Sequence, residues 1–237
     1  EQMSGISELP AVSQLAASVA HELRNPLSSI KGAAQYIRNE YQDHATVREF
    51  LDIIIEEVGV LNRITTEFLD FARPMHLNLE QMHVHDSIRR LLQVMKPQMA
   101  AQGIEAVLDL SADVPPTYFD SRQVDQMLRN IVMNAIQAMP DGGTLRVRTR
   151  TFDTPLPGVE IAIADTGRGI NPEDLHRLFT PFFTTKTKGV GLGLTIVQRI
   201  AQNHGGVVTV QCPPGGGSEF TIRLPCAPGA ESLRVSG

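Results

Sequence analysis

The first 74 residues carry apolar side chains at alternating steps of three and four, and this spacing constrains the fold more than any other feature. The first series is Val12, Leu15, Val19, Leu23, Leu27, Ile30, Ala33 and Ile37, and the second is Val47, Leu51, Ile54, Val58, Leu61, Ile64, Phe68 and Phe71. Such steps place one narrow apolar stripe along a helix that packs against other helices at a shallow angle. Residues 9–73 are therefore predicted to form a helical hairpin that is broken at residues 41–45 and stopped by Pro74.

The hairpin has a predicted start for its second helix and a predicted partner. Thr46 and Glu49 have the spacing of a capping box, with Thr46 as the N-cap. Two long helices cannot bury both stripes between themselves alone. We therefore expect a homodimer in which two hairpins form a four-helix bundle. The alternative is a hairpin that packs only on the rest of its own chain.

Composition narrows the class of protein. The chain has 237 residues, of which 42% are hydrophobic, and it contains no run of eighteen apolar residues and no export leader. Residues 1–74 hold eleven acidic and six basic side chains, whereas residues 75–237 hold fifteen of each, so neither part has a basic surface for nucleic acid. Cys212 and Cys226 are too few for a disulfide framework or a metal site, which fits a reducing cytoplasm. The absence of an initiator Met suggests a fragment.

Beyond Pro74 the pattern changes to alternating helices and strands. Strands are predicted at residues 77–82, 104–110, 144–151, 159–164, 207–211 and 219–224, and helices at 86–102, 121–138, 172–178 and 192–204. A hairpin turn is expected at Asp141-Gly142-Gly143. These elements favour an α/β two-layer sandwich. We expect three parts, namely a helical domain at 1–74, a second domain at 75–228 and a disordered tail at 229–237.

The first helix carries the sequence His21-Glu22-Leu23-Arg24-Asn25-Pro26. His21 and Asn25 are four residues apart, so they share one face, and Glu22 can reach the imidazole from the side. Pro26 cannot donate to the carbonyl of Glu22, so the helix should bend or loosen just after the histidine. A solvent-facing histidine beside a tolerated kink is the alternative interpretation.

Two motifs in the second domain have the chemistry of a nucleotide site. Asn130 and Asn134 lie one turn apart on a predicted helix, and amide oxygens are hard, neutral ligands that suit Mg²⁺. Asp165 ends a predicted strand and is followed by Gly167 and Gly169. Its carboxylate could accept a hydrogen bond from an exocyclic amine such as that of adenine, and the glycines would let the flat ring approach the backbone. Structural asparagines and an ordinary turn are the alternatives.

A third motif, with glycines at Gly189, Gly191 and Gly193, opens a predicted helix, and its backbone amides could bind phosphates. Its spacing is neither that of a dinucleotide-binding motif nor that of a P-loop. Lys186 and Lys188 precede it and could screen phosphates from a mobile lid, or be ordinary solvated charges.

The order and spacing of these motifs closely resemble the bacterial sensor histidine kinases of two-component signalling, from about residue 9 to 225. The resemblance implies that His21 takes the γ-phosphoryl group of ATP and that Glu22 orients or deprotonates the imidazole of His21. It also implies that Asn25 positions water for the dephosphorylation of a response regulator. It implies a catalytic domain of the type shared with gyrase and Hsp90-type chaperones, in which Asn134, with Asn130, holds Mg²⁺ and Asp165 reads adenine. The upstream sensor domain would then lie outside this chain, in a parent protein that could be membrane-anchored.

The chain departs from the family pattern in two respects, and other functions compete with the kinase. Many relatives have Lys or Arg where this chain has Gln137, so the phosphate contact would have to come from elsewhere, for example from Lys186. The segment between Ile170 and Gly189 is short, as in kinases of the nitrogen-regulation type. A gyrase-type hydrolase would need a Glu base at position 130, where Asn130 cannot accept a proton. A dimeric scaffold that binds nucleotide without chemistry is the second competitor.

The remaining histidines show no ligand spacing with carboxylates or cysteines, and we expect them to be surface or strand residues. They are His44, His76, His83, His85, His176 and His204.

Overall fold

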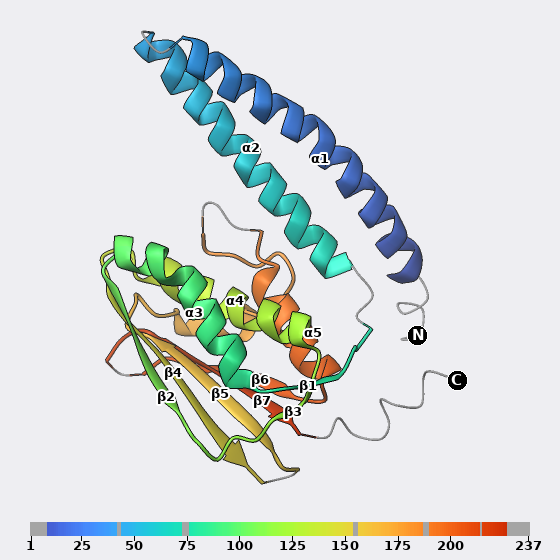
Figure 1. Ribbon diagram of the computed structural model, residues 1–237, viewed down its shortest axis with the longest axis vertical. Coiled ribbons are helices and arrows are strands. Elements are labelled where there is room, and N and C mark those ends of the chain that lie inside the picture. The colour runs from blue at the N-terminus through green and yellow to red at the C-terminus, as the bar shows by residue number, and fades with distance from the viewer. Residues whose placement is uncertain are drawn as a thin grey trace. The chain divides into compact units, whose positions relative to one another are not determined.

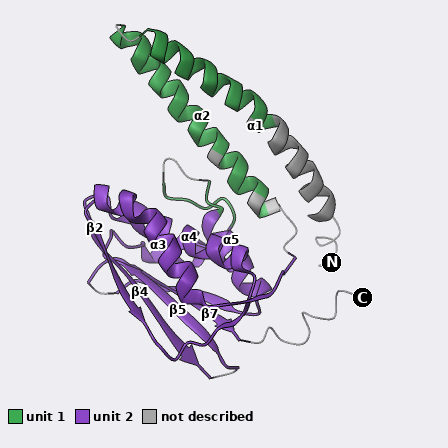
Figure 2. Ribbon diagram, in the orientation of Figure 1, with its two compact units in different colours: residues 1–74, 181–192 green, residues 75–180, 193–237 purple. Residues whose placement is uncertain are grey.

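The computed structural model describes residues 9–41, 44–72, 76–153, 156–186, 190–213 and 215–226. The chain forms two compact units, coloured separately in Figure 2. The first comprises residues 1–74 together with 181–192, and the second comprises 75–180 and 193–237. The segment 181–192 thus groups with the helices of residues 1–74 and not with the rest of the second unit.

The first unit is built on a hairpin of two long helices, α1 (Leu9–Glu40) and α2 (Ala45–Ala72), as the spacing of apolar residues predicted (Figure 1). Near the turn of the hairpin an ion pair joins Arg38 to Asp52 at 3.0 Å. The expected N-cap at Thr46 is wrong. The N–H of Arg48 donates to the carbonyl of His44 at 3.0 Å, so His44 is the N-cap and Thr46 lies inside the first turn.

The hairpin buries only part of its apolar surface. Ala34, Leu51, Val58 and Leu69 are buried, but many stripe residues on the described part of the hairpin keep two fifths or more of their surface exposed. These exposed residues are Leu23 at 49%, Ile30 at 48%, Ile37 at 40%, Ile54 at 41% and Leu61 at 47%. A row of exposed large apolar side chains on this scale is unusual for a surface that faces water alone.

The second unit is a two-layer α/β sandwich, as predicted (Figure 1). Its five-stranded sheet has the order β2 (Ile104–Leu110), β4 (Gly143–Phe152), β5 (Gly158–Asp165), β7 (Ser218–Pro225) and β6 (Val207–Gln211). β2 runs parallel to β4, and the other neighbours are antiparallel. A separate two-stranded sheet pairs β1 (Glu80–Met82) with β3 (Thr117–Phe119).

One face of the large sheet is covered by three helices, α3 (Val84–Ala101), α4 (Ser121–Ala138) and α5 (Gly193–Asn203) (Figure 1). A short 3₁₀ helix, η1 (Pro172–Arg177), precedes the segment that leads to α5. The core lies between these helices and the sheet and is almost wholly aliphatic, and its fully buried side chains include Met127, Leu128 and Ile131 of α4, Leu145 of β4 and Ile161 of β5. This packing determines which side of α4 remains available for a site.

Three expectations about the second unit are corrected. Asp141-Gly142-Gly143 does not turn a hairpin but connects α4 to β4, and the hairpin that follows joins β4 to β5. β3 was not predicted, because three residues carry too little periodicity to be recognised. His85 and His204 are not surface or strand residues. His85 lies in α3, His204 follows α5, and both are buried.

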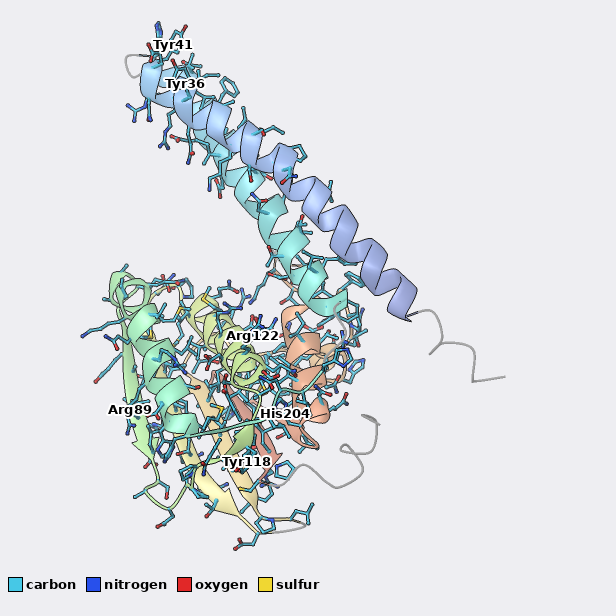
Figure 3. All side chains as sticks on the ribbon, turned by 45° about the vertical axis from the view of Figure 1, so that its right-hand side comes forward. Tyr36, Tyr41, Arg89, Tyr118, Arg122 and His204 are labelled. Atoms are coloured by element: carbon cyan, nitrogen blue, oxygen red, sulfur yellow. The ribbon has the colours of Figure 1, made fainter. Side chains whose placement is uncertain are left out.

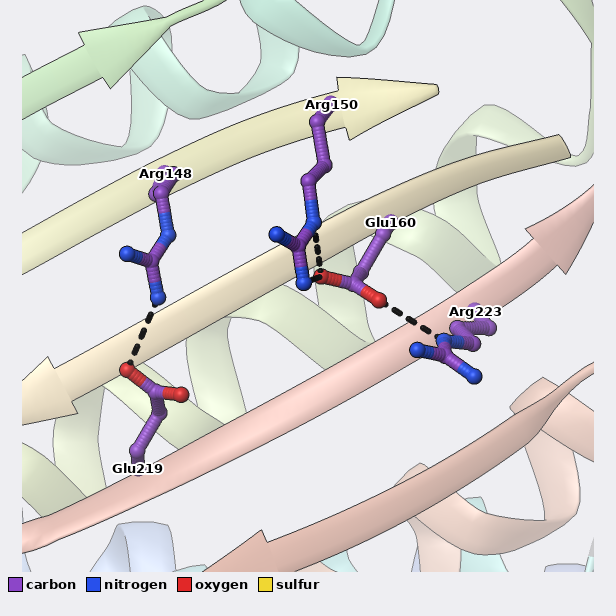
Figure 4. A network of polar contacts seen from close by, with 5 residues as sticks. All are labelled: Arg148, Arg150, Glu160, Glu219 and Arg223. Atoms are coloured by element: carbon purple, nitrogen blue, oxygen red, sulfur yellow. Dashed lines mark hydrogen bonds and ion pairs between the residues drawn. The ribbon is translucent and has the colours of Figure 1, made fainter. Parts of the chain in front are cut away.

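The uncovered face of the sheet carries a network of charged side chains (Figure 4). Glu160 is buried in its centre and accepts from Arg150 at 2.6 Å and from Arg223 at 2.7 Å, while Arg148 pairs with Glu219 at 3.2 Å. Burial raises the pKa of Glu160, but the hydrogen bonds from Arg223 and Arg150 outweigh it and hold the pKa below its usual value. The network therefore ties β4, β5 and β7 together through side chains as well as backbone.

Glu160→Gln should destabilise the protein by about 2 kcal/mol at pH 7. Each hydrogen bond to a buried carboxylate contributes roughly 1.5–3 kcal/mol, and solvent around the exposed arginines reduces that contribution. Since the pKa of folded Glu160 is lowered, the difference should be complete above about pH 5 and shrink as the pH falls through that lowered pKa. Urea unfolding across this pH range measures it. Glu219→Gln, at a more exposed pair, should cost less than half as much, and equal losses would contradict the assignment.

Candidate active site

The predicted phosphoacceptor motif lies in the middle of α1. His21 and Glu22 are helical, but their side chains lie outside the described residues. The helix continues through Pro26. Asn25 is exposed, and the Oγ of Ser29 donates to its carbonyl at 3.2 Å. The face that carries Asn25 is therefore open to solvent in the described part of the hairpin.

In the second unit, the carboxylate of Asp165, the last residue of β5, is held in place by hydrogen bonds. Its side chain is buried, and both carboxylate oxygens accept hydrogen bonds. Oδ1 accepts from the N–H of Gly167 at 2.8 Å, and Oδ2 accepts from the Oγ of Ser218 at 2.6 Å. These donors fix the orientation of the carboxylate while each oxygen retains a second lone pair, so the group is ready to accept from a ligand amine.

Gly167 and Gly169 are required by close backbone contacts. A Cβ on Gly167 would overlap the carbonyl of Ala138 at the end of α4, and the adjacent N–H of Arg168 donates to that carbonyl at 3.1 Å. Gly169 has a φ of +70°, which favours glycine, and a Cβ there would lie 3.0 Å from the carbonyl oxygen of Gly217. The loop after β5 is thus packed tightly between α4 and the loop before β7.

Ser218 is a site residue that the sequence analysis missed. It is the first residue of β7, directly opposite Asp165 in the antiparallel pairing of β5 and β7. The preceding Gly217 has a φ of +79°, and a Cβ there would overlap the carbonyl of Asp165. The available signal was the glycine run at residues 215–217 directly before a strand, which marks a close approach of two backbone segments.

Asn130 and Asn134 lie one turn apart on α4, at the edge of its buried apolar face, and both are partly exposed. The side-chain amide of Asn130 donates to the carbonyl of Gly193 at 3.3 Å, which ties α4 to the first residue of α5. The structure therefore brings together Asn130 and the last glycine of the glycine motif. Gly189, the first glycine of that motif, lies outside the described residues.

The segment 181–192 belongs to the first unit. Its backbone has a positive φ at Phe182 and at Gly191. Phe182 has a φ of +65°, its N–H donates to the carbonyl of Gly191 at 3.1 Å, and its ring meets Phe71 of α2 at a centroid distance of 6.4 Å. Gly191 has a φ of +73°, and a Cβ there would lie 2.5 Å from the carbonyl oxygen of Phe183. Both contacts shape the turn that precedes α5.

Lys186 is half-buried, and its N–H donates to the Oγ1 of Thr184 at 3.1 Å. Lys186 and Gly191 lie in the first unit, whereas Asn130, Asp165 and Gly193 lie in the second. The structure therefore brings candidate residues together only within each unit. The proposed role of Lys186 towards phosphate stays a prediction.

The donors in the second unit fit a magnesium nucleotide. Asn130 and Asn134 supply amide groups beside the N-terminus of α5, where backbone N–H groups favour phosphate oxygens. No cluster of three His, Cys, Asp or Glu side chains within the described ranges could hold a metal by itself. Mg²⁺ commonly completes such a sparse protein shell with water and the phosphates of its substrate.

Two protein families match separate parts of the chain. The family described as "His Kinase A (phospho-acceptor) domain" matches residues 11–76. The family described as "Histidine kinase-, DNA gyrase B-, and HSP90-like ATPase" matches residues 119–228. The first match contains His21, Glu22 and Asn25, and the second contains the asparagines, Asp165 and the glycine motif.

Curated relatives match nearly the whole chain. It is 36% identical to "Sensor histidine kinase ZraS" of Escherichia coli (strain K12) over 225 residues, which is 95% of this chain and 48% of that protein. It is 35% identical to "Sporulation kinase E" of Bacillus subtilis (strain 168) over 235 residues, which is 99% of this chain and 31% of that protein. The chain thus spans half or less of the length of these relatives.

Solved structures with the same architecture include nucleotide and partner complexes. Full-length ShkA in complex with AMPPNP superposes with a TM-score of 0.77 at 29% identity, covering 95% of this chain and 48% of that chain. Histidine kinase ThkA in complex with response regulator protein TrrA gives a TM-score of 0.68 at 26% identity, covering 93% and 64%. Among the described residues, no helix is both long and apolar enough to cross a membrane.

Ser218→Ala should weaken nucleotide binding about tenfold, because it removes a charge-assisted hydrogen bond from Asp165 whose loss costs roughly 1.5 kcal/mol. Ser218→Thr keeps the hydroxyl group and should bind nearly normally. Isothermal titration with a non-hydrolysable ATP analogue measures both variants. Ser111→Ala, which removes only an exposed bond to the N–H of Asp113, is the matched control, and an equal loss in Ser218→Ala and Ser111→Ala would contradict the role of Ser218.

Proposed function

The chain belongs to the sensor histidine kinases of bacterial two-component systems, and on that premise we propose that it transfers the γ-phosphoryl group of ATP to His21. The phosphoryl group would then pass to an aspartate of a response regulator. The observation that carries this proposal is the joint presence, in one chain, of a phosphoacceptor helical domain and of an ATPase-type domain with a preoriented carboxylate at Asp165.

Phosphoryl transfer depends more on positioning and charge neutralisation than on covalent assistance, and His21 suits it as the acceptor. A neutral imidazole is nucleophilic near pH 7 when one ring nitrogen is free. Glu22, the next residue along α1, would accept a hydrogen bond from the N–H of the other nitrogen and so fix the reactive tautomer. Glu22 thus acts as the orienting base in this proposal.

The residues of the second unit would hold the nucleotide. Asp165 would accept from the amino group of adenine, and Gly167 and Gly169 would let the ring approach the backbone. Asn134 and Asn130 would bind Mg²⁺, which neutralises phosphate charge when it is present. Gly189, Gly191 and Gly193, with Lys186, would contact the phosphates from the start of α5 and the segment before it.

A homodimer is supported by the apolar surface of the hairpin. Leu23, Ile30, Ile54 and Leu61 remain substantially exposed in one chain, and they lie on the two apolar stripes. Pairing two hairpins as a four-helix bundle would cover these side chains and place a second α1 and α2 along each stripe. A symmetric dimer is the commonest closed arrangement for such a self-complementary surface.

The partner would be the receiver domain of a response regulator. The structure of ThkA with TrrA shows a related kinase in such a complex. Exposed Asn25 could position water to dephosphorylate that partner, which would make the protein a phosphatase as well as a kinase. The need for ATP assigns the activity to the cytoplasm.

His21→Gln should abolish protein labelling. Wild-type protein incubated with Mg²⁺ and γ-labelled ATP should acquire an acid-labile, alkali-stable phosphate, because phosphohistidine is labile to acid. His44→Gln, at an exposed histidine of the same hairpin, should label normally. Release of free phosphate without protein labelling would favour the gyrase-type hydrolase, and nucleotide binding without turnover would favour the scaffold.

Asn25→Ala should retain autophosphorylation and lose at least tenfold of the rate at which a phosphorylated receiver domain is dephosphorylated. Asn25 would orient the attacking water, and positioning of this kind contributes several kcal/mol to a barrier. Loss of label from a purified phosphorylated receiver measures the rate. Asn39→Ala, an exposed asparagine on the same helix, is the control and should behave as wild type. Normal dephosphorylation by Asn25→Ala would remove the proposed role.

A further inference from the structure

The residues that directly follow the helical hairpin are held on the second unit by two polar side chains. The Nε2 of Gln123 donates to the carbonyl of His76 at 3.1 Å, and the Oδ2 of Asp120 accepts from the N–H of Asn78 at 2.9 Å. β1 begins two residues later and pairs with β3, which ends just before Asp120. The segment from residue 76 to 82 is therefore held by side chains at its start and by strand pairing at its end.

Asp120 and Gln123 are themselves fixed by the end of α5. The Oε1 of Gln123 accepts from the amide of Asn203 at 3.1 Å, and the Nε2 of His204 accepts from the N–H of Asp120 at 3.1 Å. The Nδ1 of His204 donates to the carbonyl of Ile200 at 2.8 Å, which leaves Nε2 as the acceptor. Figure 3 labels His204, which directly follows α5. We name Asp120, Gln123, Asn203 and His204 the linker clamp.

Two members of the linker clamp, Asp120 and His204, are buried. Asp120 and His204 are 6% and 1% exposed, and burial lowers the pKa of His204, so its neutral, accepting form is favoured. Asp120 also caps α4 through the N–H of Gln123 at 3.0 Å. Gln123 is the clamp residue of α4 nearest to Asn130, and it precedes Asn130 by seven residues, or roughly 10 Å at 1.5 Å per residue. None of these contacts of the clamp involves Asn130, Asn134 or Asp165.

We propose that the linker clamp sets the length of the tether between the phosphoacceptor helices and the nucleotide-binding domain, and thereby the rate at which ATP reaches His21. This inference depends on the proposed function. With the clamp closed, only residues 73–75 separate α2 from the first residue held on the second unit. If both clamp bonds open, the tether extends to residue 79, directly before β1.

A longer tether lowers the effective concentration of one domain at the other. For a flexible tether this concentration falls as about the −3/2 power of length, so extension from residues 73–75 to 73–77 predicts a loss of about twofold and extension to 73–79 about three- to fourfold. The binding of ATP to the second unit should not change, because Asp165 and Asn130 keep their contacts. The expected signature is therefore a lower kcat at constant KM.

Two variants of Gln123 open the clamp to different degrees. Gln123→Ala removes the bond to His76 and leaves that of Asn78, so autophosphorylation should slow about twofold. Gln123→Glu places a carboxylate against the carbonyl of His76 and the Oδ2 of Asp120, which are both acceptors, and should slow it about three- to fourfold. Gln202→Ala, an exposed glutamine beside Asn203, is the matched control and should label at the wild-type rate.

Hydrogen exchange provides a readout that does not depend on catalysis. The amide of Asn78 should exchange faster in Gln123→Glu than in wild type, while the affinity for an ATP analogue is unchanged in all variants. Faster exchange with an unchanged or increased labelling rate would overturn the proposal, as would unchanged exchange at Asn78. Wild-type protein that fails to label His21 would overturn the proposed function itself, whereas normal wild-type labelling with unaffected variants overturns only the role of the tether.

Discussion

The amphipathic character of α4 is the constraint on which the second unit depends. Its apolar residues, including Met127, Ile131 and Ala135, are buried against the sheet. Asn130 and Asn134 each precede a buried residue, Ile131 and Ala135, so they lie at the edge of this apolar face and stay partly exposed. One helix thus supplies much of the core and carries both candidate amides. Moving either asparagine one position towards the C-terminus would place it in the core.

The same helix connects the two ends of the site. At its C-terminal end, the carbonyl of Ala138 approaches so close to Gly167 that no side chain fits there, which brings the loop of Asp165 against α4. In its middle, Asn130 donates to Gly193 and so fixes the start of α5. At its N-terminal end, Asp120 caps the helix and accepts from the linker. These three groups of contacts are therefore all held by one helix.

The two faces of the sheet are stabilised by different forces. The covered face relies on burial of aliphatic side chains, which is the dominant favourable term in folding. On the uncovered face, Glu160 instead joins three strands by accepting from Arg150 and Arg223. In the described part of the hairpin of α1 and α2, large leucine and isoleucine side chains stay exposed. This surface is the observation that supports the proposed homodimer.

The sequence by itself determined the elements and the family, because both are written in local spacing. Apolar steps of three and four placed α1 and α2, and α4 was predicted with its observed bounds of Ser121 to Ala138. The ordered motifs resemble those of histidine kinases, and the phosphoacceptor and ATPase family models match the residues that carry them. Asp165 and Asn130 could be chosen because each stands in a recognisable motif, although their roles remain predictions.

Only the tertiary structure decided which distant residues meet. Ser218 reaches Asp165 from 53 positions away, and His204 reaches Asp120 from 84, so no local pattern could pair them. The connection at Asp141-Gly142-Gly143 was misassigned because the same glycine-rich turn can join two strands or a helix to a strand. Spacing along the chain specifies periodicity, but contacts between elements depend on how their buried faces pack, and that is settled only when the whole core forms.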